Sequence, residues 1–224
     1  MKKYIFSFCL SLIACSLFAQ AASIVLNKPD TNRGMNVMKA FAERSSQSKF
    51  DTISLKIQDL SDLLWAADGI NRPELGKRTA PSAMNSQDVD IYVALKKGFY
   101  LYDAKKHQLD LVAAGDFRQQ VAGRQENFAG APLFCVMISD IARFKTGSDS
   151  LKLSWAALDA GIISQNIALF CAGTGFATHP RVTMDVPKLR EILKLKPTQY
   201  PMINNLVAYK KDSENGEDCR TGRL

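Results

Sequence analysis

A long apolar segment, residues 154–174, constrains the fold of this chain more than any other feature. Its apolar residues recur at helical spacing, so the segment predicts an α-helix. Trp155, Leu158, Ile162 and Leu169, together with their neighbours, make this helix apolar on most of its sides. A helix with so little polar surface has to be buried, either in the core of a domain or at a subunit interface.

Strands and further helices surround this segment. Residues 89–95 alternate between apolar and polar, and a turn at Lys97 and Gly98 leads into a second strand over 99–102, which together predict a hairpin. The apolar run 132–139 has the length of a central strand. Other expected elements are helices over 34–45, 61–67 (capped by Asp59 or Ser61 and ended by Gly69), 114–122 and 186–195, and a last strand over 202–209. Because no regular βαβ rhythm is present, the predicted class is α+β.

The N-terminal residues are typical of an export signal. Lys2 and Lys3 form a basic region, and an apolar stretch of signal-peptide length follows over 4–18. We therefore predict a signal peptide over 1–21 and an exported protein of the periplasm or cell envelope.

Two processing routes fit this leader. Small residues at Ala19 and Ala21 suit ordinary signal peptidase, which would cut near Gln20 or Ala22. The sequence Leu-Ile-Ala-Cys over 12–15 also resembles a lipobox, in which case Cys15 would be acylated and the protein would be a lipoprotein.

The mature chain, about 200 residues, has the length of one domain, which we place at 22–209 and follow with a charged tail over 210–224. The formal charge of +7 falls to +5 when Lys2 and Lys3 are removed. The remaining surplus is spread along the chain without an arginine-rich block, so the sequence predicts no nucleic-acid partner.

Metal and hydrolase chemistry have no sequence signature here. The mature cysteines Cys135, Cys171 and Cys219 are too widely spaced for a compact zinc site, and the first two lie in apolar runs that predict buried thiols. Only two histidines are present: His107, which is predicted at the surface, and His179. No G-x-S-x-G, H-E-x-x-H or P-loop motif occurs. We therefore predict no metal site.

Two segments carry polar groups in patterns that suit a flavin nucleotide. Residues 44–50 read RSSQSKF and offer cationic and hydroxyl donors for a phosphate. Residues 80–87 read APSAMNSQ and form a run of small polar residues that can lie flat against an aromatic ring system. The content of Gly, Pro, Asn and Ser over 69–86 predicts irregular structure there.

Both segments resemble elements of the nitroreductase family of FMN oxidoreductases, R-x-S-x-[RK]-x-F and A-P-S-x-x-N-x-Q-P-W. The sequence RTAPSA over 78–83 looks like the azoline-dehydrogenase branch of that family. The resemblance covers about 35–209. It implies a nitroreductase-like α+β fold, with a central, mostly antiparallel sheet flanked by helices. It also implies an obligate homodimer with the long helix in its interface and FMN between the subunits.

The resemblance further implies a set of cofactor contacts. The phosphate side would use Arg44, Ser45, Ser46 and Ser48, and the ring would meet Pro81, Ser82 and Asn85, often from the other subunit. Gln125 would face the flavin pyrimidine. Pro180, Arg181 and Val182 would follow the N5 edge, and His179 is the candidate proton donor.

The sequence departs from the family pattern at two places. Ser48 stands where a second cation is usual, so either Lys49 or Lys77 compensates or FMN binds less tightly, and Asp88-Val89 replaces Pro-Trp. The implied reaction is ping-pong hydride transfer between an electron donor and a small organic acceptor. NAD(P)H is the family's usual donor; in an exported enzyme, either a different donor would serve or the enzyme would work as a dehydrogenase with a terminal acceptor. The alternative is a non-catalytic flavin- or small-molecule-binding protein that retains the fold.

Overall fold

The structure of the protein, a computed structural model, describes residues 23–211. The predicted signal peptide with Cys15, and the part of the predicted tail from residue 212 onward with Cys219, lie outside the described residues.

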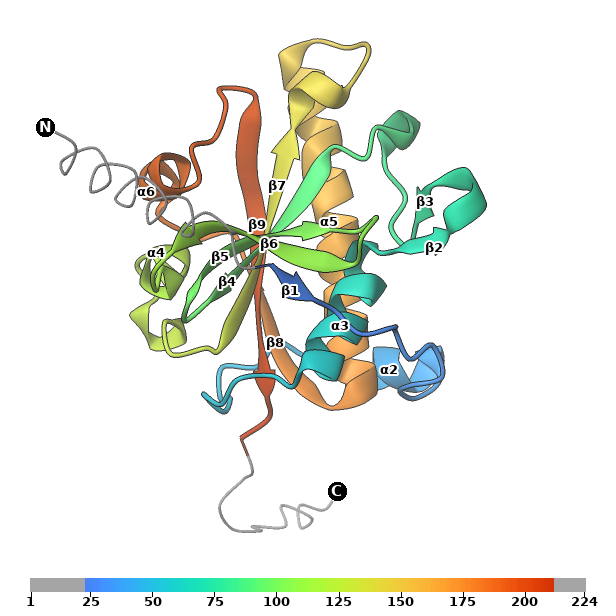
Figure 1. Cartoon of the computed structure of the whole chain (residues 1–224), viewed down its shortest axis with the longest axis vertical. Helices are drawn as coiled ribbons and strands as arrows, with labels where there is room; N and C mark the ends of the chain where they lie inside the picture. The colour runs from blue at the N-terminus through green and yellow to red at the C-terminus, as the bar shows by residue number, and fades with distance from the viewer. Residues whose placement is uncertain (1–22, 212–224) are drawn as a thin grey trace, which may run out of the picture.

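The described chain forms one seven-stranded sheet with the order β1-β6-β5-β4-β7-β9-β8, in which every neighbouring pair is antiparallel (Figure 1). The strands are β1 (Ile24–Val25), β4 (Val89–Leu95), β5 (Gly98–Asp103), β6 (Gln108–Ala114), β7 (Leu133–Asp140), β8 (Phe176–Arg181) and β9 (Gln199–Tyr209). The helices are α2 (Val37–Glu43), α3 (Ile57–Asp68), α4 (Arg118–Ala122), α5 (Asp149–Thr174) and α6 (Val186–Ile192). A small separate sheet pairs β2 (Ile70–Arg72) with β3 (Lys77–Arg78). The predicted α+β class and helix-flanked antiparallel sheet are confirmed.

Helices cover both faces of the sheet. On one face, α3 and α5 pack against side chains such as Ile91 and Cys135; on the other, α4 and α6 pack against side chains such as Tyr92 and Phe134. Successive residues of a strand point to opposite faces, so a strand covered on both sides is apolar throughout. This is why the run predicted as a central strand, now β7, is buried along its whole length.

The long apolar helix, α5, is confirmed and begins earlier than predicted. The Ser148 hydroxyl accepts from the backbone N–H of Leu151 at its start, and Gly175, at φ 82°, ends it in the left-handed conformation. By length and composition α5 could cross a membrane, but half of that stretch is buried in the protein, as in a core helix. Its outer side is not covered: Leu158 is 65% exposed and Ile162 is 36% exposed.

Several local predictions were wrong. Helix α3 begins at Ile57 with Lys56 as its N-cap, because Ser61 donates its hydroxyl to the Ile57 carbonyl and Asp59 pairs with Arg33 instead of capping. The helix predicted for 114–122 begins only at Arg118, as α4, because the unpredicted strand β6 extends to Ala114 and a short connection follows it.

The two histidines also lie in unexpected surroundings. His107 is half-buried rather than at the surface, with its Nδ1 atom 2.9 Å from the Tyr102 hydroxyl, and burial lowers its pKa. His179 lies in the edge strand β8, where the sequence predicted only a turn. The thiols of Cys135 and Cys171 are buried and free, as predicted.

Candidate active site

Residues 44–50 lie beside the edge strand β8. The backbone N–H of Gln47 donates to the carbonyl of Thr178 at 2.9 Å, and the Nδ1 atom of His179 lies 3.3 Å from the carbonyl of Gln47. These two contacts bring the segment with Arg44 next to His179 and Pro180, although about 130 residues separate them in the sequence.

The polar groups of this segment face solvent. Arg44 directly follows α2, and its side chain is exposed and forms no ion pair with any residue that the structure describes. Ser46 and Ser48 are exposed, and the Ser45 hydroxyl accepts from the side-chain amide of Gln47. An exposed guanidinium beside two free hydroxyls suits the binding of a phosphate.

Two lysines that sequence reasoning missed lie at the same end of the sheet. The backbone N–H of Asp51 donates to the carbonyl of Tyr209 at 2.9 Å, and Lys210 and Lys211 follow Tyr209 directly. These two lysines are cations close to the segment in which Ser48 stands where the family usually has a cation. Their position after the last strand was visible in the sequence, but the pairing of that strand with β8 was not.

Arg181 is positioned differently from a cofactor ligand. Its side chain is buried, its Nε donates to the Gln125 side-chain oxygen at 2.8 Å, and its guanidinium stacks 4.9 Å from the Phe128 ring centre. Burial lowers the pKa of Arg181, but the group stays a cation because an arginine pKa starts far above neutrality. Only the backbone of Arg181 remains for a ligand, whereas the neighbouring Val182 is 72% exposed.

The loop over 80–88 holds an unusual backbone conformation. Met84, Asn85 and Gln87 have φ angles of 53°, 54° and 46°, in the left-handed region that residues with a side chain rarely adopt. Such strain persists only where surrounding contacts enforce it, and it concentrates at functional sites. Here the Gln87 N–H donates to the Ser82 hydroxyl at 2.9 Å, and the Ala83 N–H donates to the Asp159 carboxylate on α5 at 2.8 Å.

Asp88, which stands where the family motif has proline, has a structural role in this loop. Its carboxylate is fully buried and accepts from the hydroxyls of Ser139 at 2.5 Å and Ser86 at 3.1 Å. Asp159 lies against Asp88, and burial together with this second carboxylate raises the pKa of Asp159 to about 7. We therefore expect the protonated Asp159 side chain to donate to Asp88 and so to join α5 to the loop.

This proton makes stability depend on pH. The pKa of Asp159 is higher in the folded protein than in the unfolded chain, so the folded state binds a proton that the unfolded state has released. The resulting stability is lost as the pH rises from about 4 to about 7. Asp68, which pairs with Arg78 and whose pKa burial raises to about 7, acts in the same direction.

Asp159→Asn is expected to stabilise the protein at alkaline pH. Asparagine can accept from Ala83 and donate to Asp88 as the protonated acid does, at every pH. We expect the variant to exceed the natural protein by about 1 kcal/mol in free energy of unfolding near pH 8 and to match it near pH 4, below the range in which the stability is lost. Urea denaturation at both pH values measures this. Asp110→Asn is the control, because the Asp110 carboxylate accepts only from Gln108 among the residues 23–211. An unchanged pH dependence in Asp159→Asn would contradict the shared proton.

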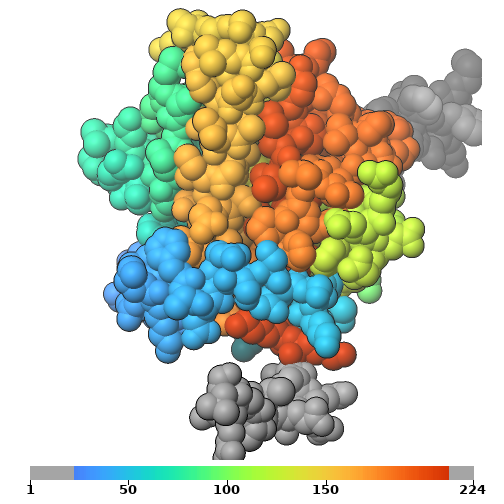
Figure 2. Space-filling view, turned by 180° about the vertical axis from the view of Figure 1, so that it is seen from behind, coloured from blue at the N-terminus to red at the C-terminus, as the bar shows by residue number. Residues whose placement is uncertain are grey.

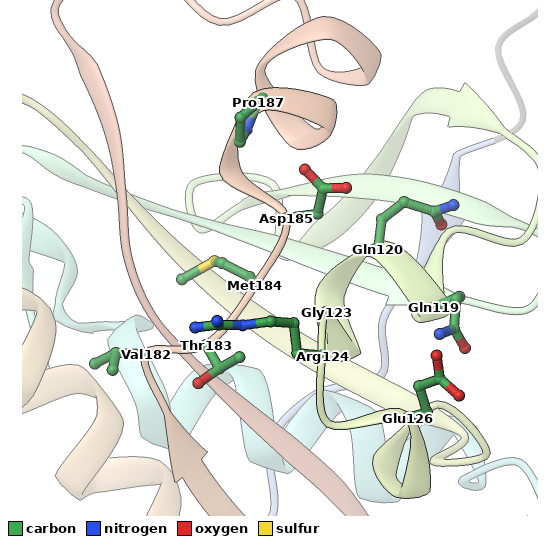
Figure 3. Close-up of a pocket in the computed structure, with 10 residues that line it drawn as sticks. All are labelled: Gln119, Gln120, Gly123, Arg124, Glu126, Val182, Thr183, Met184, Asp185 and Pro187. Atoms are coloured by element: carbon green, nitrogen blue, oxygen red, sulfur yellow. The ribbon is translucent and has the colours of Figure 1, made fainter.

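A pocket of about 680 Å³ opens beside β8 (Figure 3). One wall is formed by α4 and the residues after it, and the other by the segment that follows β8. Figure 3 shows Arg124 extending from the first wall toward Val182 and Thr183 on the second. The lining residues are Gln119, Gln120, Gly123, Arg124, Glu126, Val182, Thr183, Met184, Asp185 and Pro187. The pocket is large enough for a small organic molecule next to the exposed end of β8.

Residues 41–207 match the model of the nitroreductase family. The chain belongs to this family. Its fold agrees with a nitroreductase-like protein of Ralstonia eutropha JMP134, with 33% sequence identity and a TM-score of 0.79 over 84% of this chain and 90% of that one. No curated protein is similar enough to the chain to match it.

Two more distant structures share the fold. One belongs to the McbBCD microcin synthetase of E. coli, solved with truncated pro-MccB17 bound, with 16% identity and a TM-score of 0.68 over 95% of this chain and 85% of that one. The other is NfrA2 of B. megaterium, with 20% identity and a TM-score of 0.57 over 80% and 68%. Nitroreductase family members are in general flavin-dependent oxidoreductases, and their fold is commonly dimeric.

The candidate residues of this nitroreductase family member fall into two groups within one protomer. The loop with Ser82 is anchored at Asp159 of α5, whereas the segment before α2 is anchored where the Met35 N–H donates to the carbonyl of Gly173. These anchors are 14 residues apart along α5, or about 20 Å. Figure 2 shows α5 crossing the middle of one face, with the region around 75–85 on one side and the segment after β8 on the other.

Proposed function

We propose that the protein is an FMN-dependent oxidoreductase that works as a homodimer. Hydride would pass from an electron donor to the flavin and then, after the donor leaves, to a small organic acceptor. The observation that carries the proposal is the Gln47–Thr178 hydrogen bond, which sets the exposed Arg44 segment against the strand that ends at Pro180 and Arg181. A group of hydrogen-bond donors that can bind a phosphate therefore lies beside an accessible edge strand.

The outer side of α5 supports the dimer. Side chains at alternating spacings of four and three residues form a stripe along it, the pattern of helices that pair side by side. The stripe consists of Leu151, Trp155, Leu158, Ile162, Gln165 and Leu169, and Leu151, Leu158 and Ile162 are among the exposed large hydrophobic side chains. Two copies of α5 packed antiparallel about a two-fold axis would bury this stripe.

The same pairing would complete the site. With the two-fold axis near Asn166, midway between the two anchors, the Asp159 region of one protomer would lie near the Gly173 region of the other, and the 80–88 loop would face the partner's Arg44 segment. The strained loop, fixed by Ser82 and Asp159, would serve as a rigid wall for the flavin ring.

Within the site, each group has a separate task. Arg44, Ser45, Ser46 and Ser48 would bind the phosphate, with Lys210 as the cation that Ser48 does not supply. Pro81, Ser82 and Asn85 would line the ring. The side-chain amide of Gln125, oriented by Arg181, would face the pyrimidine, and the backbone from Pro180 to Val182 would follow the N5 edge. FMN supplies the hydride chemistry when bound, and the protein positions it and limits its contact with water.

His179 is the side chain best placed to exchange a proton near this edge. A carbonyl can only accept, so the contact between His179 Nδ1 and the Gln47 carbonyl places a proton on Nδ1. Its Nε2 atom has no hydrogen-bond partner within the described part of the chain. We propose His179 as the proton donor on this geometry.

Substrate and location are further parts of the proposal. The RTAPSA sequence favours the azoline-dehydrogenase branch, and the fold shared with McbBCD, whose structure holds truncated pro-MccB17, agrees with that choice. We propose export through the leader over 1–21, by cleavage near Gln20 or Ala22 or by acylation of Cys15. An electron donor other than NAD(P)H would then serve. The mass of the mature N-terminus distinguishes the two leader routes.

Purified protein is expected to be yellow and to release FMN on denaturation. After photoreduction, the bound flavin should reoxidise when a quinone or nitroaromatic acceptor is added, which stopped-flow absorbance measures. Protein that stays colourless and takes up no FMN would exclude the proposal. Bound flavin that no acceptor reoxidises would indicate the second candidate, a non-catalytic flavin-binding protein, which the replacements at Ser48 and Asp88 favour.

A further inference from the structure

A second concave surface, the β4–β5 groove, has no residue in common with the candidate active site. Its volume is about 300 Å³. It lies where the turn between β4 and β5 meets β1, the start of α3 and the start of β7. The groove is lined by Ile24, Ser54, Leu55, Ile57, Leu60, Leu95, Lys96, Lys97, Tyr100, Pro132 and Leu133. Its size is at the lower end of the range for small-ligand sites.

The walls of the groove are mostly aliphatic, and its polar groups gather near the β4–β5 turn. Leu60, Leu133 and Tyr100 are nearly buried, with exposures of 6%, 1% and 5%. A concave surface with this lining gains free energy when an apolar chain replaces water in it.

The Tyr100 hydroxyl has no hydrogen-bond partner among the residues that the structure describes. Tyr100 is one of the residues that line the groove. A buried tyrosine hydroxyl normally has a partner. The hydroxyl is therefore a donor available to a ligand in the groove.

Lys96 and Lys97 supply positive charge at the same end. Both are exposed, and neither forms an ion pair within the described part of the chain. They follow Leu95 at the turn, and Tyr100 lies two residues into the strand after it. Two ammonium groups and one hydroxyl at the end of an aliphatic groove are complementary to a carboxylate on an alkyl chain.

We propose that the β4–β5 groove binds a free single-chain amphiphile with an anionic headgroup, such as a medium-chain carboxylate. The alkyl chain would lie against Leu55, Leu60 and Leu133. The carboxylate would accept from the Tyr100 hydroxyl and face Lys96 and Lys97. The limited volume favours one short chain over the larger contact surface of a bilayer.

Titration of the whole protein with decanoate, below its aggregation concentration, tests the proposal by isothermal calorimetry. We expect saturable one-to-one binding, and octanoate should bind roughly 15-fold more weakly because it has two fewer methylene groups. Decylammonium, with the same chain and the opposite charge, should not bind detectably. Absence of decanoate binding, or equal binding of both amphiphiles, would overturn the proposal.

Variants locate the site. The double change Lys96→Glu and Lys97→Glu should weaken decanoate binding at least 10-fold, and Ser54→Trp, at an exposed position on the rim, should block it. The matched control is Lys105→Glu with Lys106→Glu at the next turn, which should leave binding unchanged. Equal losses in the control would show nonspecific attraction and refute the site. Binding to anionic vesicles without binding to monomeric decanoate would refute it in favour of a membrane surface.

Discussion

Arg44→Ala is expected to weaken FMN binding by about 100-fold or more. A hydrogen bond to a charged group contributes about 1.5–3 kcal/mol, and a guanidinium can donate two to one phosphate. Arg44 is exposed and forms no ion pair within the described residues, so its loss should not affect folding. Titration of apoprotein with FMN, followed by quenching of flavin fluorescence, gives the dissociation constant.

Riboflavin provides the internal control, because it has the ring but no phosphate. Its affinity should be the same in Arg44→Ala and in the natural protein. Lys105→Ala, at an exposed position in the β5–β6 turn, should affect neither ligand. If FMN binds equally well to Arg44→Ala, the phosphate does not lie at the end of α2 and the proposed orientation of the cofactor is wrong.

Leu158→Glu is expected to convert the dimer into monomers. Burial of an unpaired carboxylate costs several kcal/mol, and a two-fold axis places the change on both sides of the interface, so dimerisation should weaken about 1000-fold or more. Within one protomer Leu158 is 65% exposed, so the monomer should keep its stability. Sedimentation velocity measures the association, and chemical denaturation measures the stability.

The flavin content of the Leu158→Glu variant shows whether the FMN site is shared between protomers or lies within one protomer. If the site is shared between protomers, Leu158→Glu should lose FMN together with dimerisation. Val112→Glu, which changes another exposed hydrophobic residue on β6, should keep both. A Leu158→Glu protein that remains dimeric would show that α5 does not form the interface.

The sequence predicted the elements whose pattern is set by local burial. The strands predicted over 89–95 and 132–139 match β4 and β7 almost to the residue, because strands between two helical layers are apolar along most of their length. The long helix was also predictable from the sequence. It is apolar on most sides because one side is buried in the core and the other carries exposed apolar side chains.

The elements at the sheet edge were not predictable in the same way. β8 contains Thr178, His179 and Pro180, a combination with weak strand signals, and its conformation depends on pairing with β9. The buried position of Arg181 depends on Gln125 and Phe128, which are more than 50 residues away. Sequence patterns report local preference, and these contacts form only after the chain has folded.

In the candidate site, too, the local motifs were predictable from the sequence and the long-range contacts were not. The motif around Arg44 was recognisable, and its proximity to Pro180 follows from one backbone hydrogen bond that no local pattern encodes. Lys210 was overlooked because only the β8–β9 pairing brings it near that segment. The role of Asp88 as a partner of Ser139 and Asp159 was likewise not evident where the family motif has proline.

The distance of about 20 Å between the two anchors on α5 has a genetic consequence. A chain defective at Arg44 and a chain defective at the Ser82 loop would each form inactive pairs. If both chains are made in one cell or refolded together, they would also form mixed dimers. In each mixed dimer, one of the two sites would be formed by two unaltered segments. Two individually inactive alleles would therefore restore part of the activity when combined, whereas two defects within the same segment would not.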